Sequence, residues 1–270
     1  MKKHLSTIIL VFVFLVGLSV VLYPTVSDYW NSRTQTRAIA AYQDSMKDMK
    51  PENYTAYFEA AEDYNNRLRK TPGAFTDPSL VAGYEDTLGI SGTGVMGYIT
   101  IEKIGVELPI YHGMEEGTLQ IAAGHLEGSS LPIGGAGTHA VISAHRGLPS
   151  AKLFTNLDEL EKGDTFTITV MNRVLTYEVD QIAIVEPEDT EKLQIVDGQD
   201  YCTLLTCTPY GINTHRLLVR GTRIATTEKP QIYVAAEAQR MDPLLVAPLV
   251  AVPMLLILLI YLLIRYRRKK

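Results

Sequence analysis

A cysteine and an arginine on two neighbouring predicted strands are the first candidates for chemistry in this chain. The apolar run at residues 201–208 is typical of a strand and carries Cys207 near its end. Residues 209–211, Pro-Tyr-Gly, interrupt that strand, and a second β-prone run starts at Arg216. Because positive charge beside a thiol favours the reactive thiolate, the pattern indicates Cys207 as a nucleophile with Arg216 facing it.

The other cysteine is Cys202, five residues before Cys207. On one strand the two side chains point to opposite faces, about 16 Å apart along the strand. A disulfide needs Cα atoms within roughly 7 Å, so we expect two thiols that are not paired with each other. Cys202 lies mid-strand with no adjacent base in the sequence, and we expect it to be an ordinary buried cysteine.

His145 is the candidate acid/base. It follows the strand-like run at residues 140–143, and a histidine at a strand end can reach a thiol at the end of a neighbouring strand. The spacing of the histidines and cysteines does not predict a zinc site, and no serine-nucleophile elbow is present. The acidic stretch at residues 186–191 is typical of a solvated loop, so we expect no metal and no cofactor.

The elements that must position these residues are mostly β. A hairpin is expected across residues 171–173, and short helical turns are expected at 118–123 and 150–157. Several short strands separated by turn signals predict a closed or nearly closed β-barrel. The candidate strands are residues 97–101, 106–110, 140–143, 165–170, 174–185, 201–208 and 217–223.

Two apolar segments frame the chain, residues 5–23 and 244–264, each near the roughly 20 residues that cross a bilayer. Basic residues lie at the outer end of both segments, so the positive-inside rule predicts that both chain ends are cytoplasmic and that the residues between are not. We favour an uncleaved N-terminal anchor over a signal peptide, because the residues after Tyr23 match a cleavage site poorly. The net charge of −5, without a basic patch, gives no indication of nucleic-acid binding.

Several segments resemble motifs of one enzyme family, the sortases. Thr203-Leu204-Leu205-Thr206-Cys207, followed nine residues later by Arg216, resembles the active-site motif TLxTC…R. The strand that ends in Ser143-Ala144-His145-Arg146-Gly147 is similar to the sortase histidine motif. Residues 123–132 and 148–154 resemble class C, the pilin-polymerising branch, and the likeness runs through roughly residues 72–225.

The resemblance implies a sortase β-barrel and a transpeptidase that recognises a Leu-Pro-x-Thr-Gly-like sorting signal on a surface protein. Cys207 would attack the Thr carbonyl to form a thioacyl intermediate, which requires an activated thiolate. His145 would act as general acid and base. Arg216 would bind substrate carbonyls or the developing oxyanion. We expect Leu205 and Thr206, beside the nucleophile, to contact the substrate.

In class C the acceptor would be a lysine amine of the next pilin, so that repeated turnover builds a covalent fibre. Three alternatives stay open: a sortase that anchors proteins to a cell-wall precursor, a cysteine peptidase that transfers to water, and a non-catalytic membrane-anchored scaffold for pilus assembly. Retention of Cys207, His145 and Arg216 together argues against the scaffold.

Residues 72–94 resemble the class C lid, which carries Asp-Pro-aromatic and occludes the cleft. Asp77 and Pro78 are present, but Ser79 stands where the aromatic is expected, and Phe75 is the candidate for its hydrophobic role. We expect a weaker or differently anchored lid with Asp77 paired to Arg216, against the alternative of an ordinary Asp-Pro turn.

The expected domain order follows from these segments. It is a membrane anchor at 1–30, a helical region at 31–71, the lid at 72–94, the catalytic barrel at 95–225, a linker at 226–243, and a membrane helix with a basic cytoplasmic tail at 244–270.

Overall fold

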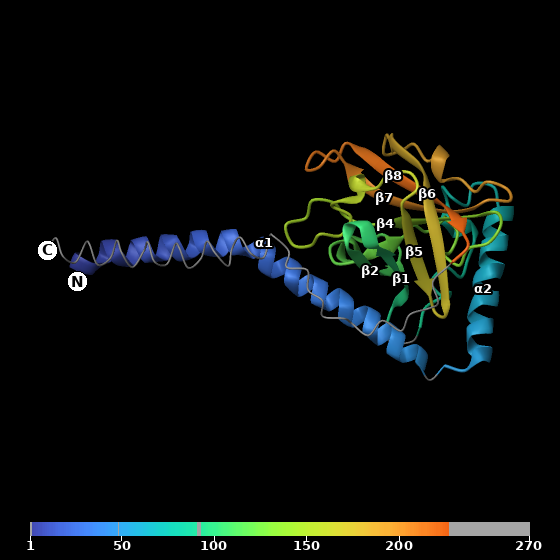
Figure 1. Cartoon of the computed structure of the whole chain (residues 1–270), viewed down its shortest axis with the longest axis horizontal. Coiled ribbons are helices and arrows are strands. Elements are labelled where there is room, and N and C mark those ends of the chain that lie inside the picture. The colour runs from blue at the N-terminus through green and yellow to red at the C-terminus, as the bar shows by residue number, and fades with distance from the viewer. Residues whose placement is uncertain (1, 48, 91–92, 227–270) are drawn as a thin grey trace. The chain divides into compact units, whose positions relative to one another are not determined.

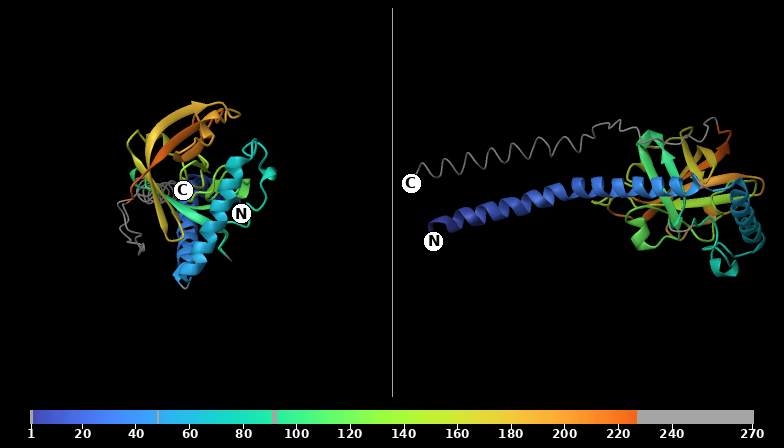
Figure 2. Two further views of the ribbon diagram at one scale, coloured as in Figure 1. Left: turned by 90° about the vertical axis from the view of Figure 1, so that its right-hand side faces the viewer. Right: turned by 90° about the horizontal axis from the view of Figure 1, so that it is seen from below.

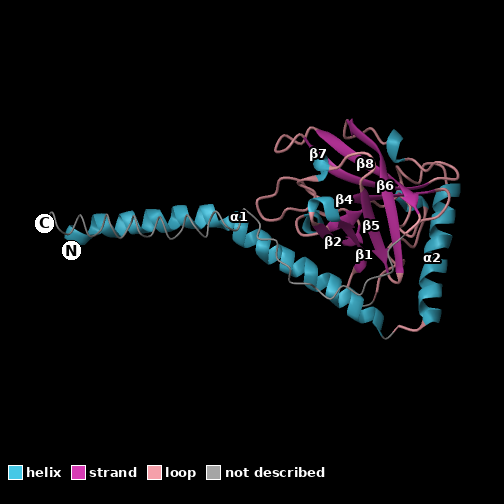
Figure 3. Ribbon diagram, in the orientation of Figure 1, coloured by secondary structure: helices cyan, strands magenta, loops and turns pink. Residues whose placement is uncertain are grey.

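The structure is a computed structural model that describes residues 2–47, 49–90 and 93–226 (Figures 1 and 3). The predicted C-terminal membrane segment, residues 244–264, lies outside the described residues. The helices are α1 (Lys2–Lys47), α2 (Pro51–Lys70) and α3 (Glu116–Leu119), with short 3-10 helices η1 (Pro78–Leu80), η2 (Glu102–Ile104), η3 (Leu157–Glu159) and η4 (Glu191–Leu193).

Helix α1 contains the candidate N-terminal membrane span. Within the described residues one helix, at Leu10–Lys47, is long and apolar enough to cross a bilayer by length and composition. The large apolar side chains of its first turns, such as Phe12 and Val20, are exposed. This agrees with the apolar segment predicted at residues 5–23. The orientation of the chain ends stays a prediction.

The predicted closed barrel is confirmed. Its strands hydrogen-bond in the order β1-β2-β3-β4-β7-β8-β6-β5 and close the sheet on itself. Alternating apolar residues supply the inner face of the longer strands, as the period of two requires. The strands are β1 (Val95–Ile101), β2 (Val106–His112), β3 (Ala123–His125), β4 (Thr138–Ser143), β5 (Thr165–Val170), β6 (Arg173–Val185), β7 (Asp200–Thr208) and β8 (His215–Ile224).

Two predicted helical turns differ in their bounds from those observed. The helical turn expected at residues 118–123 is present as α3 (Glu116–Leu119) and the turn after it, and the three-residue strand β3, which is too short to give an alternating pattern, begins at Ala123. The helical turn expected at residues 150–157 starts later: residues 153–156 form hydrogen-bonded turns that lead into the 3-10 helix η3, and a bridge joins Leu148 and Ala151 before them. The hairpin between β5 and β6 forms as expected, with Val170 paired to Arg173.

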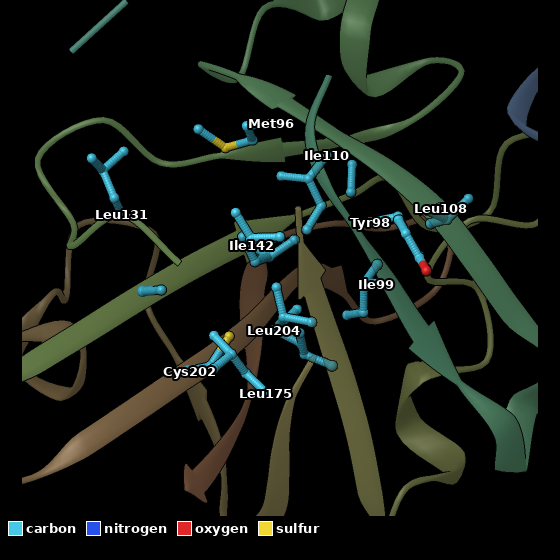
Figure 4. Packing of buried hydrophobic residues seen from close by; sticks show 14 of the residues in the cluster. Met96, Tyr98, Ile99, Leu108, Ile110, Leu131, Ile142, Leu175, Cys202 and Leu204 are labelled. Atoms are coloured by element: carbon cyan, nitrogen blue, oxygen red, sulfur yellow. The ribbon is translucent and has the colours of Figure 1, made fainter. Parts of the chain in front are cut away.

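Strands β4 and β7 are parallel neighbours, and β8 returns antiparallel to β7. The carboxyl ends of β4 and β7 and the start of β8 therefore meet at one rim of the barrel. The core inside the barrel includes the fully buried Ile99, Ile142 and Leu204, together with Cys202 (Figure 4). Even-numbered residues of β7 thus face inward, and Leu205 and Cys207 face outward.

Two helical segments attach to the outside of the barrel through buried polar anchors. In α1, the Tyr42 hydroxyl donates to the Met96 carbonyl at 3.1 Å and accepts from the Met171 amide at 2.8 Å. In α2, which lies beside the barrel in Figures 1 and 2, Asn65 exchanges two hydrogen bonds with the backbone of Leu131, at 3.2 and 2.7 Å. These bonds satisfy buried groups that would otherwise destabilise the fold.

His125 on β3 and His139 on β4 are structural histidines. The His125 ring contacts the Tyr84 hydroxyl and the Ser130 carbonyl, each at 2.8 Å. The His139 ring contacts the Gln194 carbonyl at 2.9 Å and the Thr203 hydroxyl at 2.7 Å. Each neutral ring can thus donate one bond and accept one. Burial lowers the pKa of each to about 4 from an ordinary 6.5.

These two histidines predict a loss of stability in mild acid. Because their folded pKa is depressed, the neutral form stabilises the fold above about pH 6.5, and this contribution is lost as the pH falls towards 4. The shift corresponds to about 3 kcal/mol for each group at most. Thermal unfolding of the full chain in detergent should show His139→Gln less stable than wild type at pH 7, with the difference shrinking by pH 4.5. A difference that stays constant over this range would contradict the assignment.

Candidate active site

Cys207 and Arg216 are direct partners across the antiparallel pair β7 and β8. Both side chains are half-buried at the rim of the barrel. The Arg216 guanidinium donates to the carbonyls of Asn213 and His215 at 3.3 and 3.2 Å, which hold it at the base of the β7–β8 turn. This arrangement places a fixed cation on the strand beside the thiol, where it can stabilise a thiolate or an oxyanion.

Cys202 lies inside the barrel with no exposed surface. Burial raises the pKa of its thiol far above the ordinary value, so it stays protonated at neutral pH. Both cysteines are free thiols, as expected from their spacing. Of the two, Cys207 is the one that solvent and a substrate can reach.

His145 lies two residues beyond the end of β4. The last register pair is Ser143 with Leu205, and the Ala144 amide still donates to the Leu205 carbonyl at 3.3 Å. Because the two strands are parallel, two more residues along each bring His145 to the end of β7 that carries Cys207, on the same face of the sheet. The strand ends thus gather a thiol, an imidazole and a guanidinium at one rim.

Glu116 on α3 faces His145, the candidate acid/base. No sequence motif indicated Glu116. Its carboxylate oxygen Oε2 lies 3.4 Å from Nε2 of His145, an ion-pair contact without hydrogen-bond alignment. A hydrogen bond from Gln120 and the charge of His145 lower the pKa of the Glu116 carboxyl, so it is ionised at neutral pH.

Thr206, which we expected to contact the substrate, has its side chain turned into the barrel and away from the rim. Its side chain is buried on the inner face of β7 because neighbouring residues on a strand point to opposite sides. The Thr206 hydroxyl donates to the Ala144 carbonyl at 2.8 Å. It therefore holds the backbone next to His145.

Leu205 faces outward on β7, two residues before Cys207. It packs against an apolar cluster on the outer face of β4, β6 and β8, and Phe75 packs against the same cluster. The core of this cluster is Val141, Val185, Leu193 and Leu218. An apolar surface that leads to a thiol suits the apolar part of a peptide.

Residues 72–90 have little regular structure beyond η1 but are firmly anchored. Val81, Tyr84 and Leu88 are buried, and a Cβ on Gly128 would lie only 2.8 Å from the Phe75 carbonyl oxygen. Gly128 therefore allows this segment to approach the loop after β3 closely. Buried side chains, rather than regular secondary structure, thus hold this segment against the barrel.

The expected pairing of Asp77 with Arg216 is wrong for the described residues. Asp77 and Ser79 are both exposed, and the Ser79 hydroxyl donates to the Asp77 carboxylate at 2.6 Å. Arg216 instead uses the two carbonyls of its own turn. The residue in place of the usual aromatic thus supplies a local partner for the aspartate.

Comparison with known proteins gives one family. A model of the sortase domain matches residues 99–224. Sortase C1 from Streptococcus agalactiae is 49% identical, with a TM-score of 0.64 over 70% of this chain and 99% of that structure. A Clostridium perfringens sortase C, solved with the C-terminal cell wall sorting motif, is 41% identical, with a TM-score of 0.63 over 71% of this chain and all of that structure.

Curated relatives are more distant. Sortase A of Streptococcus agalactiae is 33% identical over 42% of this chain and 47% of that protein, so the match spans about half of its length. Sortase A of Bacillus anthracis is 25% identical over 84% of this chain and 99% of that protein.

Proposed function

The chain belongs to the sortase family, whose members are cysteine transpeptidases, and we propose that it is a class C sortase that joins pilin subunits. It cleaves a Leu-Pro-x-Thr-Gly-like signal between Thr and Gly. It then transfers the Thr acyl group from Cys207 to a lysine amine of another pilin. The observation that carries this proposal is the register pair of Cys207 and Arg216 beside the strand end that leads to His145.

The reaction uses these groups in two steps. The Cys207 thiolate attacks the Thr carbonyl carbon, and Arg216 stabilises the oxyanion that forms. His145 protonates the departing glycine amine, so the peptide bond breaks and a thioester remains on Cys207. The lysine ammonium then loses a proton to His145, and its neutral amine attacks the thioester. The products are an isopeptide bond and a free thiol.

The similarity of this chain to a sortase C linked to pili supports a pilin lysine as the acceptor. A "pilus-related sortase C" of Group B Streptococcus is 41% identical to this chain, with a TM-score of 0.61 over 68% of this chain and 95% of that structure.

Product analysis tests the acceptor. The full chain is incubated in detergent with a sorting peptide and one of three nucleophiles: a lysine-bearing pilin peptide, a peptidoglycan-type amine, or water alone. An isopeptide product with the pilin lysine is expected. Exclusive transfer to the wall amine or to water would overturn the proposal.

Phe75 controls access to Cys207 in this proposal. Its ring packs against the cluster that includes Leu205, two residues before Cys207 on the same face. Phe75→Ala should therefore expose the substrate surface and raise the hydrolysis of a sorting peptide several-fold, measured as initial rate with a quenched fluorescent peptide. The burial that is lost corresponds to about 1–2 kcal/mol, or roughly 5- to 30-fold in the open population.

Leu80→Ala is the matched control, because Leu80 belongs to the same segment but is 53% exposed. It should leave the rate within about two-fold of wild type, since little burial is lost. Equal rates for Phe75→Ala and wild type would show that this ring does not restrict access.

A further inference from the structure

Arg146, the residue after the candidate histidine, is an almost fully buried cation that the proposed reaction does not use. Only 9% of its side chain is exposed. It forms an ion pair with Asp158 of η3 and donates to the Thr208 hydroxyl at 3.4 Å. Its guanidinium also lies 6.0 Å from the centre of the Tyr210 ring.

These contacts join two segments that are separate in the chain. Arg146 follows His145, whereas Thr208 and Tyr210 follow Cys207. The two segments also meet at Gly147, where a Cβ would lie 3.0 Å from the Tyr210 ring. Through one guanidinium, the backbone that carries the imidazole is tied to the backbone that carries the thiol.

Stability alone does not account for this arrangement. Among the described residues, Nε of Arg146 is buried without a hydrogen-bond partner, and a buried donor left in this way destabilises a fold. Asp158 is half exposed, so solvent weakens its attraction for the cation. What Arg146 supplies is geometry, because its planar fork reaches an acid, a hydroxyl and a ring at once.

We propose that Arg146, held by Asp158, is a positioning residue that fixes His145 relative to Cys207. The inference rests on the proposed function, since it assigns Arg146 to the alignment of the two groups that react. Misplacing catalytic groups by about 1 Å can lower a rate by roughly 100-fold, so a loosened ion pair should act on the reaction more than on the fold.

The chain contains a matched control pair. Arg220 on β8 donates to Asp180 at 3.0 and 2.7 Å and lies 4.1 Å from the centre of the Tyr201 ring. This group also combines an arginine, an aspartate and a tyrosine, but Arg220 lies four residues along β8 from Arg216, away from the rim. Asp180 is 29% exposed, less than the 50% of Asp158, so its loss should cost the fold more.

The test compares Asp158→Asn, Asp158→Glu and Asp180→Asn in the full chain in detergent, using a sorting peptide with a lysine acceptor. We expect Asp158→Asn to lower kcat by about 10-fold or more with KM within about two-fold, and Asp158→Glu to recover most of it. Asp180→Asn should lower Tm at least as much and keep kcat. Unchanged kcat in Asp158→Asn, or an equal loss in Asp180→Asn, would overturn the proposal.

Two further measurements keep the outcome decisive. If Asp158→Asn does not fold, Arg146→Lys is tested in its place, because lysine retains the charge and the aliphatic stem. It should show the same loss of kcat, and a wild-type kcat would overturn the proposal.

Alkylation of Cys207 by iodoacetamide at neutral pH needs no substrate, so it separates this inference from the proposed function. If the wild type yields no product from any peptide, the proposed function fails, and slower alkylation in Asp158→Asn than in Asp180→Asn still supports the positioning role. Equal alkylation would contradict it.

Discussion

Replacing Cys207 by alanine is expected to reduce transpeptidation to the background rate, a loss of at least about 10⁴-fold in kcat. The chemistry needs a thiolate that forms and then releases the acyl group, and alanine offers no atom that can do so. The rate is measured as the appearance of isopeptide product from a sorting peptide and a lysine acceptor. Residual product above the background would mean that another residue is the nucleophile.

Cys202→Ala is the matched control for this substitution. Cys202 is also a free thiol on β7, but it lies inside the barrel and burial raises the pKa of its thiol. Its replacement removes one buried sulfur and should lower stability by about 1–2 kcal/mol without changing kcat. A large loss of activity in this variant, with the fold intact, would contradict the assignment of the two cysteines.

Arg216→Lys is expected to lower kcat by about 100- to 1000-fold, the range found when a donor to an oxyanion is removed. Lysine keeps the charge, but it lacks the planar fork that can bind two turn carbonyls and still face the reacting carbonyl. Because the loss falls on the transition state, kcat should drop while KM changes little. Stopped-flow or discontinuous assays with a fluorescent sorting peptide separate the two constants.

Arg223→Lys serves as the comparison on the same strand. Arg223 donates to the Thr176 carbonyl and the Thr226 hydroxyl near the far end of β8, away from the rim. Its substitution should leave kcat within about two-fold of wild type, as for most sites outside the reaction centre. Comparable losses in both variants would show that Arg216 acts through the strand rather than through the substrate.

The turn signals between short strands were enough to predict the barrel, and the Pro-Tyr-Gly break between two β-prone runs was enough to predict that Cys207 meets Arg216. The two runs are β7 and β8, and the turn between them sets the register that pairs these residues. Strand β3 escaped prediction because three residues with a central glycine carry no periodic signal. The two-residue alternation of side chains along a strand, applied to Thr206, would have placed its side chain inside the barrel.

The residues that sequence reasoning missed are those whose partners are distant in the chain or carry no motif. Glu116 lies 29 residues before His145, and Asp158 lies 12 residues after Arg146, so only the folded barrel brings each pair together. The Asp77 prediction failed for a local reason, because Ser79 supplies a nearer partner than Arg216. An exposed side chain can pair with any of several neighbours, and the spacing of residues in the sequence does not determine which one it binds.

The most direct test of the account is the mass of the intact chain after incubation with a Leu-Pro-x-Thr-Gly peptide. We expect an increase equal to the peptide acylated through its Thr, mapped by digestion to Cys207, with Cys202 unmodified. The adduct should form at least as fast in Phe75→Ala, be absent in Cys207→Ala, and disappear when a lysine acceptor is added. No adduct in either the wild type or Phe75→Ala, with the protein folded, would contradict the assignment of this chain as a transpeptidase acting on that signal.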